Sequence, residues 1–263
     1  MSLIYEPKGK AREYSPLALN VYSGGCDHRC DYCYCPSIMR GVWSATPRPR
    51  DLSGLAREAA SARRQVLLCF MSDPYCLAEQ TYRNTRSALA VLSSARCSVA
   101  ILTKGGARCL DDLDMFKAWP DGRIKVGATL TAWGKGFQEY WEPGAAAPCD
   151  RIDTLRQLHD AGVQTWASIE PVIDPVESLA AIDASLPCVD AYKVGKWNHD
   201  ARANATDWPA FAKAAVDMIR RAGKRLYVKA DLRPHLPDGY LTAAECDMES
   251  LSLPDRPQER ALL

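Results

Sequence analysis

The chain has 263 residues, of which 47% are hydrophobic and 25% charged, and its formal net charge is +1 at pH 7. This length suits one large domain, which buries enough surface to fold without disulfide staples. The longest apolar stretches, such as residues 66–71, are too short to cross a bilayer, and the first residues lack a continuous apolar signal segment. We therefore expect a cytoplasmic protein with no membrane partner. The net charge neither demands nor excludes a polyanionic partner.

The predicted elements alternate between strand-length apolar runs and longer helical patterns. The predicted strands cover residues 17–22, 66–71, 98–103, 124–130, 164–170, 189–194 and, as a candidate seventh, 226–229. The predicted helices cover residues 51–64, 78–93, 110–118, 151–161, 176–184 and 207–222. This alternation favours a parallel sheet with covering helices. Periodicity alone does not separate an open doubly wound sheet from a barrel or partial barrel.

The two ends of the chain differ from its middle. Residues 1–16 and 233–263 are rich in proline and charge, so we expect an N-terminal extension, a core domain over residues 17–232, and a C-terminal extension. The C-terminal extension is also a candidate cover for one end of a barrel.

Eleven cysteines are a high count for a cytoplasmic chain, where such usage favours metal binding or catalysis over disulfides. Most are isolated and are expected to be small buried side chains. Three lie close together, Cys26, Cys30 and Cys33, directly after the first predicted strand. Their C-x3-C-x2-C spacing brings three thiolates to one side of a short loop. Three thiolates can hold three irons of a [4Fe–4S] cubane, which usually has four cysteine ligands, and so leave the fourth iron open.

Polar side chains and glycines also follow the other predicted strands, where the site of a parallel α/β fold is expected. These strand ends contain Ser72 to Tyr75, Thr103 to Gly106, Thr129 with Thr131, Ser168 to Asp174, and Lys193 to His199.

The cysteine run with an aromatic residue, Tyr32, before the third cysteine resembles the radical S-adenosylmethionine (radical SAM) superfamily. Three segments resemble its spore photoproduct lyase-like branch. They are Cys-Asp-Tyr-Cys-Tyr, Ser-Asp-Pro-Tyr followed by Glu79 and a helix over residues 82–86, and Leu-Thr-Lys after the third predicted strand. The resemblance covers roughly residues 17–232. It implies a partial (β/α)6 TIM-type barrel.

The resemblance further implies a cofactor set and a reaction. Cys26, Cys30 and Cys33 would ligate a [4Fe–4S] cluster whose open iron binds S-adenosylmethionine (SAM). One electron from an external donor of the flavodoxin or ferredoxin type would cleave SAM to methionine and a 5′-deoxyadenosyl radical. This radical would abstract a hydrogen atom from a substrate, while the protein orients the reactants and excludes water.

The resemblance also assigns cofactor contacts. Tyr32 would touch the adenine, Ser72 and Asp73 the methionine amino group, and Thr129 and Thr131 the ribose and carboxylate. The remaining contacts would bracket the adenine from the next two strands: Ile169, Glu170, Val194 and Gly195. For Glu170 we expect a polar contact more than proton transfer. Each polar residue alone is also an ordinary turn or cap former.

Candidate substrate contacts lie nearby. They are Tyr75, Cys76, Lys193, Lys196, Trp197 and Asn198. In spore photoproduct lyases a hydrogen-donating cysteine precedes the Ser/Thr-Asp pair, whereas here Met71 fills that place. Cys69 lies too early, and strand alternation predicts that it points away from the site, so Cys76 is the candidate substitute.

Several alternatives stay open. The substrate is a nucleic acid or nucleotide, favoured by the branch resemblance and by local arginine groups, or a peptide or small metabolite. The remote alternatives are a structural zinc protein that uses Cys26, Cys30, Cys33 and Cys35, and a non-catalytic nucleic-acid-binding descendant. Zinc ligands usually come as two separated pairs, which this loop does not offer.

Overall fold

The computed structural model describes residues 2–39, 43–198 and 200–257. In these residues eight strands form one sheet in the order β1-β2-β5-β6-β7-β8-β9-β10, and β3 pairs with β4 in a small second sheet. The strands are β1 (Ile4–Tyr5), β2 (Leu17–Leu19), β3 (Tyr22–Ser23), β4 (Arg48–Pro49), β5 (Val66–Leu68), β6 (Val99–Thr103), β7 (Ile124–Thr129), β8 (Gln164–Ile169), β9 (Ala191–Val194) and β10 (Arg225–Val228). Within the large sheet β1 is antiparallel to β2, and every other neighbouring pair is parallel.

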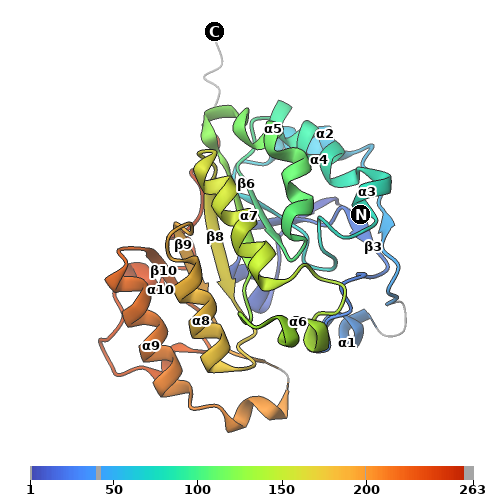
Figure 1. The fold of residues 1–263 in the computed structure, drawn as a ribbon. Coiled ribbons are helices and arrows are strands. Elements are labelled where there is room, and N and C mark those ends of the chain that lie inside the picture. Colours follow the sequence, from blue (N-terminus) through green and yellow to red (C-terminus); the bar gives the residue numbers. More distant parts are fainter. Residues whose placement is uncertain (1, 40–42, 199, 258–263) are drawn as a thin grey trace.

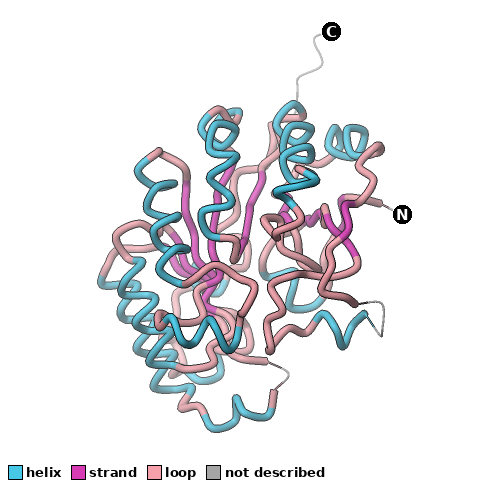
Figure 2. The backbone as a smooth tube through the Cα atoms, turned by 45° about the vertical axis from the view of Figure 1, so that its right-hand side comes forward, coloured by secondary structure: helices cyan, strands magenta, loops and turns pink. Residues whose placement is uncertain are grey.

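Helices connect the parallel strands and cover the outer face of the sheet (Figures 1 and 2). The α-helices are α1 (Cys35–Met39), α2 (Leu55–Ser61), α3 (Glu79–Tyr82), α4 (Asn84–Ser94), α5 (Leu113–Lys117), α6 (Lys135–Trp141), α7 (Pro148–Asp160), α8 (Pro175–Ser185), α9 (Trp208–Arg221) and α10 (Ala243–Cys246). The 3-10 helices are η1 (Gly9–Glu13), η2 (Gly106–Asp112), η3 (Pro120–Gly122), η4 (Ala201–Ala205) and η5 (Arg233–His235). None of the helices described in the structure combines the length and apolar character needed to span a bilayer.

The predicted partial barrel is confirmed, with local differences. All seven predicted strands are present, and β10 is a full member of the sheet. The first predicted strand is divided into two short strands, β2 and β3. The cysteine loop therefore begins after β3. The helix predicted over residues 78–93 is interrupted at Arg83, whose φ of 51° is left-handed and ends α3 before α4 begins.

Two apolar cores hold the barrel together. The larger core lies between the sheet and the helices, and the smaller one fills the barrel interior around Trp166, Tyr227 and Leu67. Such inward-facing and outward-facing sets follow from the alternation of side chains along each strand.

Residues 9–14, predicted as part of an extension, lie within the fold. The two outer strands of the sheet, β1 and β10, do not pair with each other. Glu13 lies beside β9 and β10, since the Lys193 ammonium donates to its carbonyl at 2.5 Å and the Tyr227 hydroxyl donates to its carboxylate at 2.7 Å. We therefore attribute part of the closure of the open barrel to this N-terminal segment.

The C-terminal segment covers the amino end of the barrel. The backbone N–H of Leu253 donates to Gln65 at 2.9 Å, and the Lys125 ammonium donates to the carbonyl of Leu251. Gln65 and Lys125 stand at the beginnings of β5 and β7, so the tail lies at the end of the barrel opposite to the cysteine loop.

Candidate functional site

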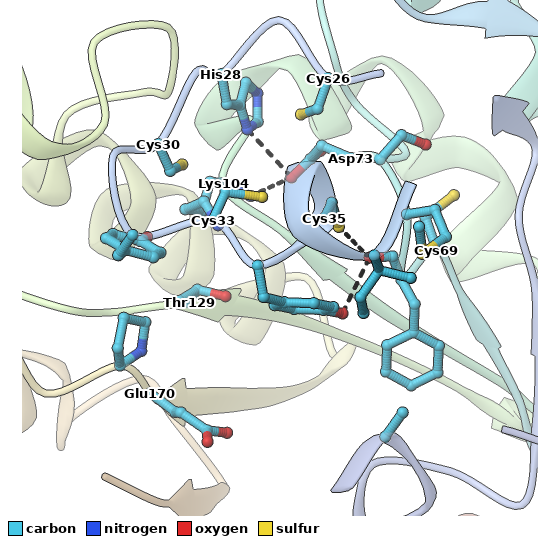
Figure 3. Close-up of a pocket in the computed structure, with 18 of the residues that line it drawn as sticks. Cys26, His28, Cys30, Cys33, Cys35, Cys69, Asp73, Lys104, Thr129 and Glu170 are labelled. Carbon is cyan, nitrogen blue, oxygen red and sulfur yellow. Dashed lines mark hydrogen bonds and ion pairs between the residues drawn. The ribbon is translucent and has the colours of Figure 1, made fainter. Parts of the chain in front are cut away.

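A cavity of about 860 Å³ opens at the carboxyl ends of the strands. Its walls come from the cysteine loop, the end of β7, the residues after β5, β6, β8, β9 and β10, and the N-terminal segment. Figure 3 shows the cysteine loop with Asp73, Lys104, Thr129 and Glu170. Of the residues predicted from the sequence, it is lined by Cys26, Cys30, Tyr32, Cys33, Ser72, Asp73, Thr129, Glu170, Lys196, Trp197 and Asn198. The fold thus brings together residues that are up to 172 positions apart, between Cys26 and Asn198.

The three cysteines of the motif lie on one loop that faces this cavity (Figure 3). Burial raises the pKa of Cys26 to about 12 and that of Cys30 to about 11, whereas a hydrogen bond from Cys35 lowers the pKa of Cys33 to about 6. Metal ligation requires thiolates, so a bound cluster has to replace the protons of Cys26 and Cys30.

The loop geometry argues against a single zinc ion. Within residues 2–39, 43–198 and 200–257, no three His, Cys, Asp or Glu side chains are placed to hold one metal ion between them. A zinc ion needs its four ligands within bonding distance of one point. The cavity is lined by the three cysteines of the motif and also by Cys35 and Cys69. The three motif cysteines, which share one loop, fit a larger iron–sulfur cluster with one open iron.

His28, which lies between two of the cysteines, packs beside the loop. Its side chain is 1% exposed, its Nε2 lies 2.9 Å from an Arg108 nitrogen, and its Nδ1 lies 3.5 Å from the Asp73 carboxylate. Arg108 and Asp73 therefore join the cysteine loop to the segments after β6 and β5.

Asp73 is held by three hydrogen bonds. Its carboxylate accepts from the Thr103 hydroxyl at 2.6 Å, the Lys104 amide at 2.7 Å and the Tyr75 amide at 2.8 Å. The neighbouring Ser72 differs, because its buried hydroxyl has no hydrogen-bond partner among the described residues. Ser72, unlike Asp73, thus has a polar group that is not already hydrogen-bonded to the protein and can bind a ligand in the cavity.

Tyr32 is attached to a buried ion pair that the sequence reasoning missed. Its hydroxyl donates to the carboxylate of Glu142, which also binds the Arg151 guanidinium. Thr131 donates to the same carboxylate at 3.2 Å and does not line the cavity, unlike Thr129. Thr131 therefore lies behind the cavity wall, and its role as a cofactor contact stays a prediction.

Glu170 anchors the opposite wall. Its carboxylate accepts from the Tyr14 hydroxyl at 2.6 Å, from the Asn198 amide at 3.1 Å, and from the Lys229 ammonium. Tyr14 and Lys229 both line the cavity, but they lie in a segment read as an extension and at the end of the last strand. Only the position of Lys229 at the end of a predicted strand gave a signal in the sequence.

Six predicted contacts besides Thr131 do not line the cavity. Ile169 and Val194 are buried in the core between sheet and helices, and Gly195 packs against the side chains of Glu170 and Lys229. Tyr75 and Cys76 are buried in the same core as Ile169 and Val194, and Lys193 is buried inside the barrel. Tyr75 donates to Asp112 at 3.0 Å, and Lys193 donates to backbone carbonyls inside the barrel. His199, part of the last predicted polar group, lies outside the described residues.

The prediction for the two cysteines near strand β5 was wrong. Cys69 lines the cavity, whereas Cys76 is fully buried in the core. The strand ends at Leu68, and Cys69 has a left-handed φ of 62°, so the alternation of an extended strand no longer sets its direction.

Comparison with known proteins identifies the class. The family model of the radical SAM superfamily matches residues 20–186, more than half of the chain. The chain belongs to the radical SAM superfamily. An iron–sulfur cluster is characteristic of this superfamily, and the matched structures include one with bound SAM.

Two curated relatives are similar in sequence. An uncharacterized protein of Methanocaldococcus jannaschii is 28% identical over 159 residues, which cover 59% of this chain and 60% of that protein. An uncharacterized protein of Acidianus two-tailed virus is 25% identical over 187 residues, which cover 65% of this chain and 60% of that protein. The matched region thus spans about 60% of the length of these relatives.

Solved structures share the fold. SuiB of Streptococcus suis bound to S-adenosylmethionine matches with a TM-score of 0.64 and 12% identity, over 86% of this chain and 53% of that chain. Spore photoproduct lyase complexed with a dinucleoside spore photoproduct matches with a TM-score of 0.65 and 13% identity, over 82% of this chain and 77% of that chain. At these identities the likeness concerns the fold alone.

Proposed function

We propose that this chain is a radical SAM enzyme that acts on an anionic substrate, a nucleic acid or a nucleotide. The observation that carries the reaction is the C-x3-C-x2-C loop, whose three cysteines face one large cavity at the carboxyl ends of a parallel barrel. A [4Fe–4S] cluster with SAM supplies reductive cleavage of SAM to a 5′-deoxyadenosyl radical, with the electron from an external donor of the flavodoxin or ferredoxin type.

The protein's own residues bind and orient. Cys26, Cys30 and Cys33 hold the cluster, and the free hydroxyl of Ser72 is available to a polar group of SAM. Tyr32 lines the cavity with Cys30 and Cys33 and would border a ligand at the open iron. The apolar and aromatic wall around Phe70 excludes water from the reacting atoms.

The charges of the cavity favour an anionic substrate. Its two lining carboxylates, Asp73 and Glu170, are both occupied by hydrogen bonds from the protein. Four of its lining cations form no ion pair with a carboxylate among the described residues: Lys8, Arg29, Lys104 and Lys196. Unpaired cations around a cavity raise the local concentration of anions, and phosphate groups are such anions.

The reaction is tested by product release. Anaerobically reconstituted protein with dithionite and SAM should release 5′-deoxyadenosine, and Cys30→Ala should abolish this release. Cys149→Ala, which changes an exposed cysteine on α7, is the matched control and should behave as the wild type. Undiminished release by Cys30→Ala would overturn the cluster assignment.

The substrate class is tested by binding to single- and double-stranded DNA and RNA across a salt series. Affinity should fall with salt, and replacement of Lys8 and Lys196 by Gln should weaken binding and reduce the slope. Lys213→Gln on α9 is the control, because Lys213 pairs with Asp217 outside the cavity. Absence of binding at low salt would remove the polynucleotide and leave a nucleotide, a peptide or another small metabolite.

A further inference from the structure

A buried ion pair lies directly behind the cysteine loop. Glu142, the residue after α6, is 0% exposed, and Arg151 in α7 is 1% exposed. The carboxylate of Glu142 binds the guanidinium of Arg151 and also accepts the hydroxyl of Tyr32. Burial of two charges is costly even when they are paired, and apolar packing usually serves stability as well. The pair therefore calls for a role other than stability.

Both charged groups are fixed from several sides. Arg151 donates to the carbonyl of Thr129 at 2.9 Å and to that of Ala146 at 2.8 Å, while Thr131 donates to Glu142. Burial by itself raises the pKa of Glu142, but Arg151 and Lys104 outweigh it and hold this pKa below its ordinary value. The hydroxyl of Tyr32 is thus directed at an immobile carboxylate, and hydrogen bonds to ionised acceptors are the stronger kind.

We infer that Glu142 and Arg151 are positioning residues that fix the ring of Tyr32, and with it the spacing of Cys30 and Cys33. Tyr32 stands between these two cysteines in the chain, lines the cavity, and lies with its ring centroid 5.7 Å from the Lys104 ammonium. The ion pair connects helix α7 to the loop, so the barrel holds the ring that borders the cluster's ligand. The expected effect of this positioning on SAM binding rests on the proposed function.

The test is Tyr32→Phe, which removes only the hydroxyl and keeps the ring, the cysteines and the ion pair. We expect unchanged iron and sulfide content after reconstitution, and a dissociation constant for SAM that rises about tenfold. In the cluster-free protein, amide hydrogen exchange over residues 26–34 should become faster while the strands keep their wild-type rates. A merely structural hydroxyl would leave the SAM affinity of loaded protein unchanged.

Tyr240→Phe is the matched control, since Tyr240 also donates to a carboxylate, that of Asp217, away from the cavity. It should leave both SAM affinity and loop exchange unchanged. Thr131→Val is a second variant that removes a more distant donor to Glu142, and we expect a smaller change of the same sign.

Wild-type SAM affinity together with wild-type loop exchange in Tyr32→Phe would overturn the positioning role. Failure of the wild-type protein itself to bind SAM would instead contradict the proposed function. In that case the exchange rates of cluster-free Tyr32→Phe still decide whether the ion pair orders the loop.

Discussion

The hydroxyl of Tyr14 donates a hydrogen bond of 2.6 Å to the carboxylate of Glu170, so the N-terminal segment reaches the carboxyl end of β8. Lys229, at the end of β10, donates to the same carboxylate and is 2% exposed. One partly buried carboxylate, 14% exposed, thus joins three parts of the chain that form the cavity wall opposite to the cysteine loop.

Removal of that carboxylate should destabilise the fold. We expect Glu170→Ala to lower the free energy of unfolding by about 1.5–3 kcal/mol, because it removes the charged hydrogen-bond partner of Lys229 and leaves only the Glu13 carboxylate, 3.8 Å away, as its counter-charge. Tyr14→Phe keeps the ion pair and should cost about 1 kcal/mol. Urea denaturation followed by circular dichroism measures both. Equal effects of the two variants would show that Glu13 replaces Glu170 as the partner of Lys229.

Much of this arrangement was open to prediction. The apolar strand runs and their helical connections define the parallel sheet, and the cysteine spacing defines the loop. The role of residues 9–14 was not predictable, because proline and charge at a chain end are typical of exposed segments. Glu13 and Tyr14 become buried only through partners on β8, β9 and β10, which no local pattern in the first residues indicates.

The C-terminal cover of the barrel makes a separate prediction. Leu251 and Leu253 are 4% and 5% exposed, although they lie in a tail with few regular elements. We expect Leu251→Ala and Leu253→Ala each to cost about 2–4 kcal/mol of unfolding free energy. Met248→Ala, at a position 39% exposed, is the control and should change it by less than about 0.5 kcal/mol. Wild-type stability of both leucine variants would show that the tail does not seal this end.

Lys193 should give the unfolding free energy a measurable pH dependence. Burial, and then the charge of Lys229, lower the pKa of Lys193 from 10.5 to about 7. Between these values the unfolded chain binds the proton that the folded chain has lost, so the contribution of Lys193 to stability rises with pH. Between pH 7 and pH 9 the unfolding free energy of the wild type should rise by about 2 kcal/mol relative to that of Lys193→Met. A difference that stays constant over this range would mean that Lys193 keeps its proton in the fold.

The structure places predicted site residues at the cavity where a motif and a strand end coincide, and departs from the expected placement where backbone direction or tertiary partners decide. Cys69 turns into the cavity because a left-handed residue follows β5, and a sequence pattern does not report φ. Thr131 was read as a cofactor contact, but it binds Glu142, whose burial depends on Arg151 nine residues later in another helix.

Gly144 provides the last prediction, because its contact with the cysteine loop leaves no room for a side chain. Its amide donates to the carbonyl of His28 at 2.9 Å, and a Cβ atom there would lie 2.1 Å from the carbonyl oxygen of Asp27. We therefore expect Gly144→Ala to displace the loop that carries Cys26 and Cys30. Iron uptake on anaerobic reconstitution should fall to less than about half of the wild-type value, because the ligands are no longer preorganised.

The control for this variant lies in the same segment. Gly136 is in helix α6, and a Cβ atom built there meets nothing within 4 Å. Gly136→Ala should keep wild-type iron content and gain about 0.5–1 kcal/mol of stability, since alanine is the better helix former. Iron and sulfide assays with the visible absorption spectrum measure cluster content in both variants. Equal iron content in Gly144→Ala and Gly136→Ala would show that the 142–146 segment does not support the cluster loop. Loss of iron in Gly144→Ala alone would tie cluster binding to the contact between Gly144 and the cysteine loop.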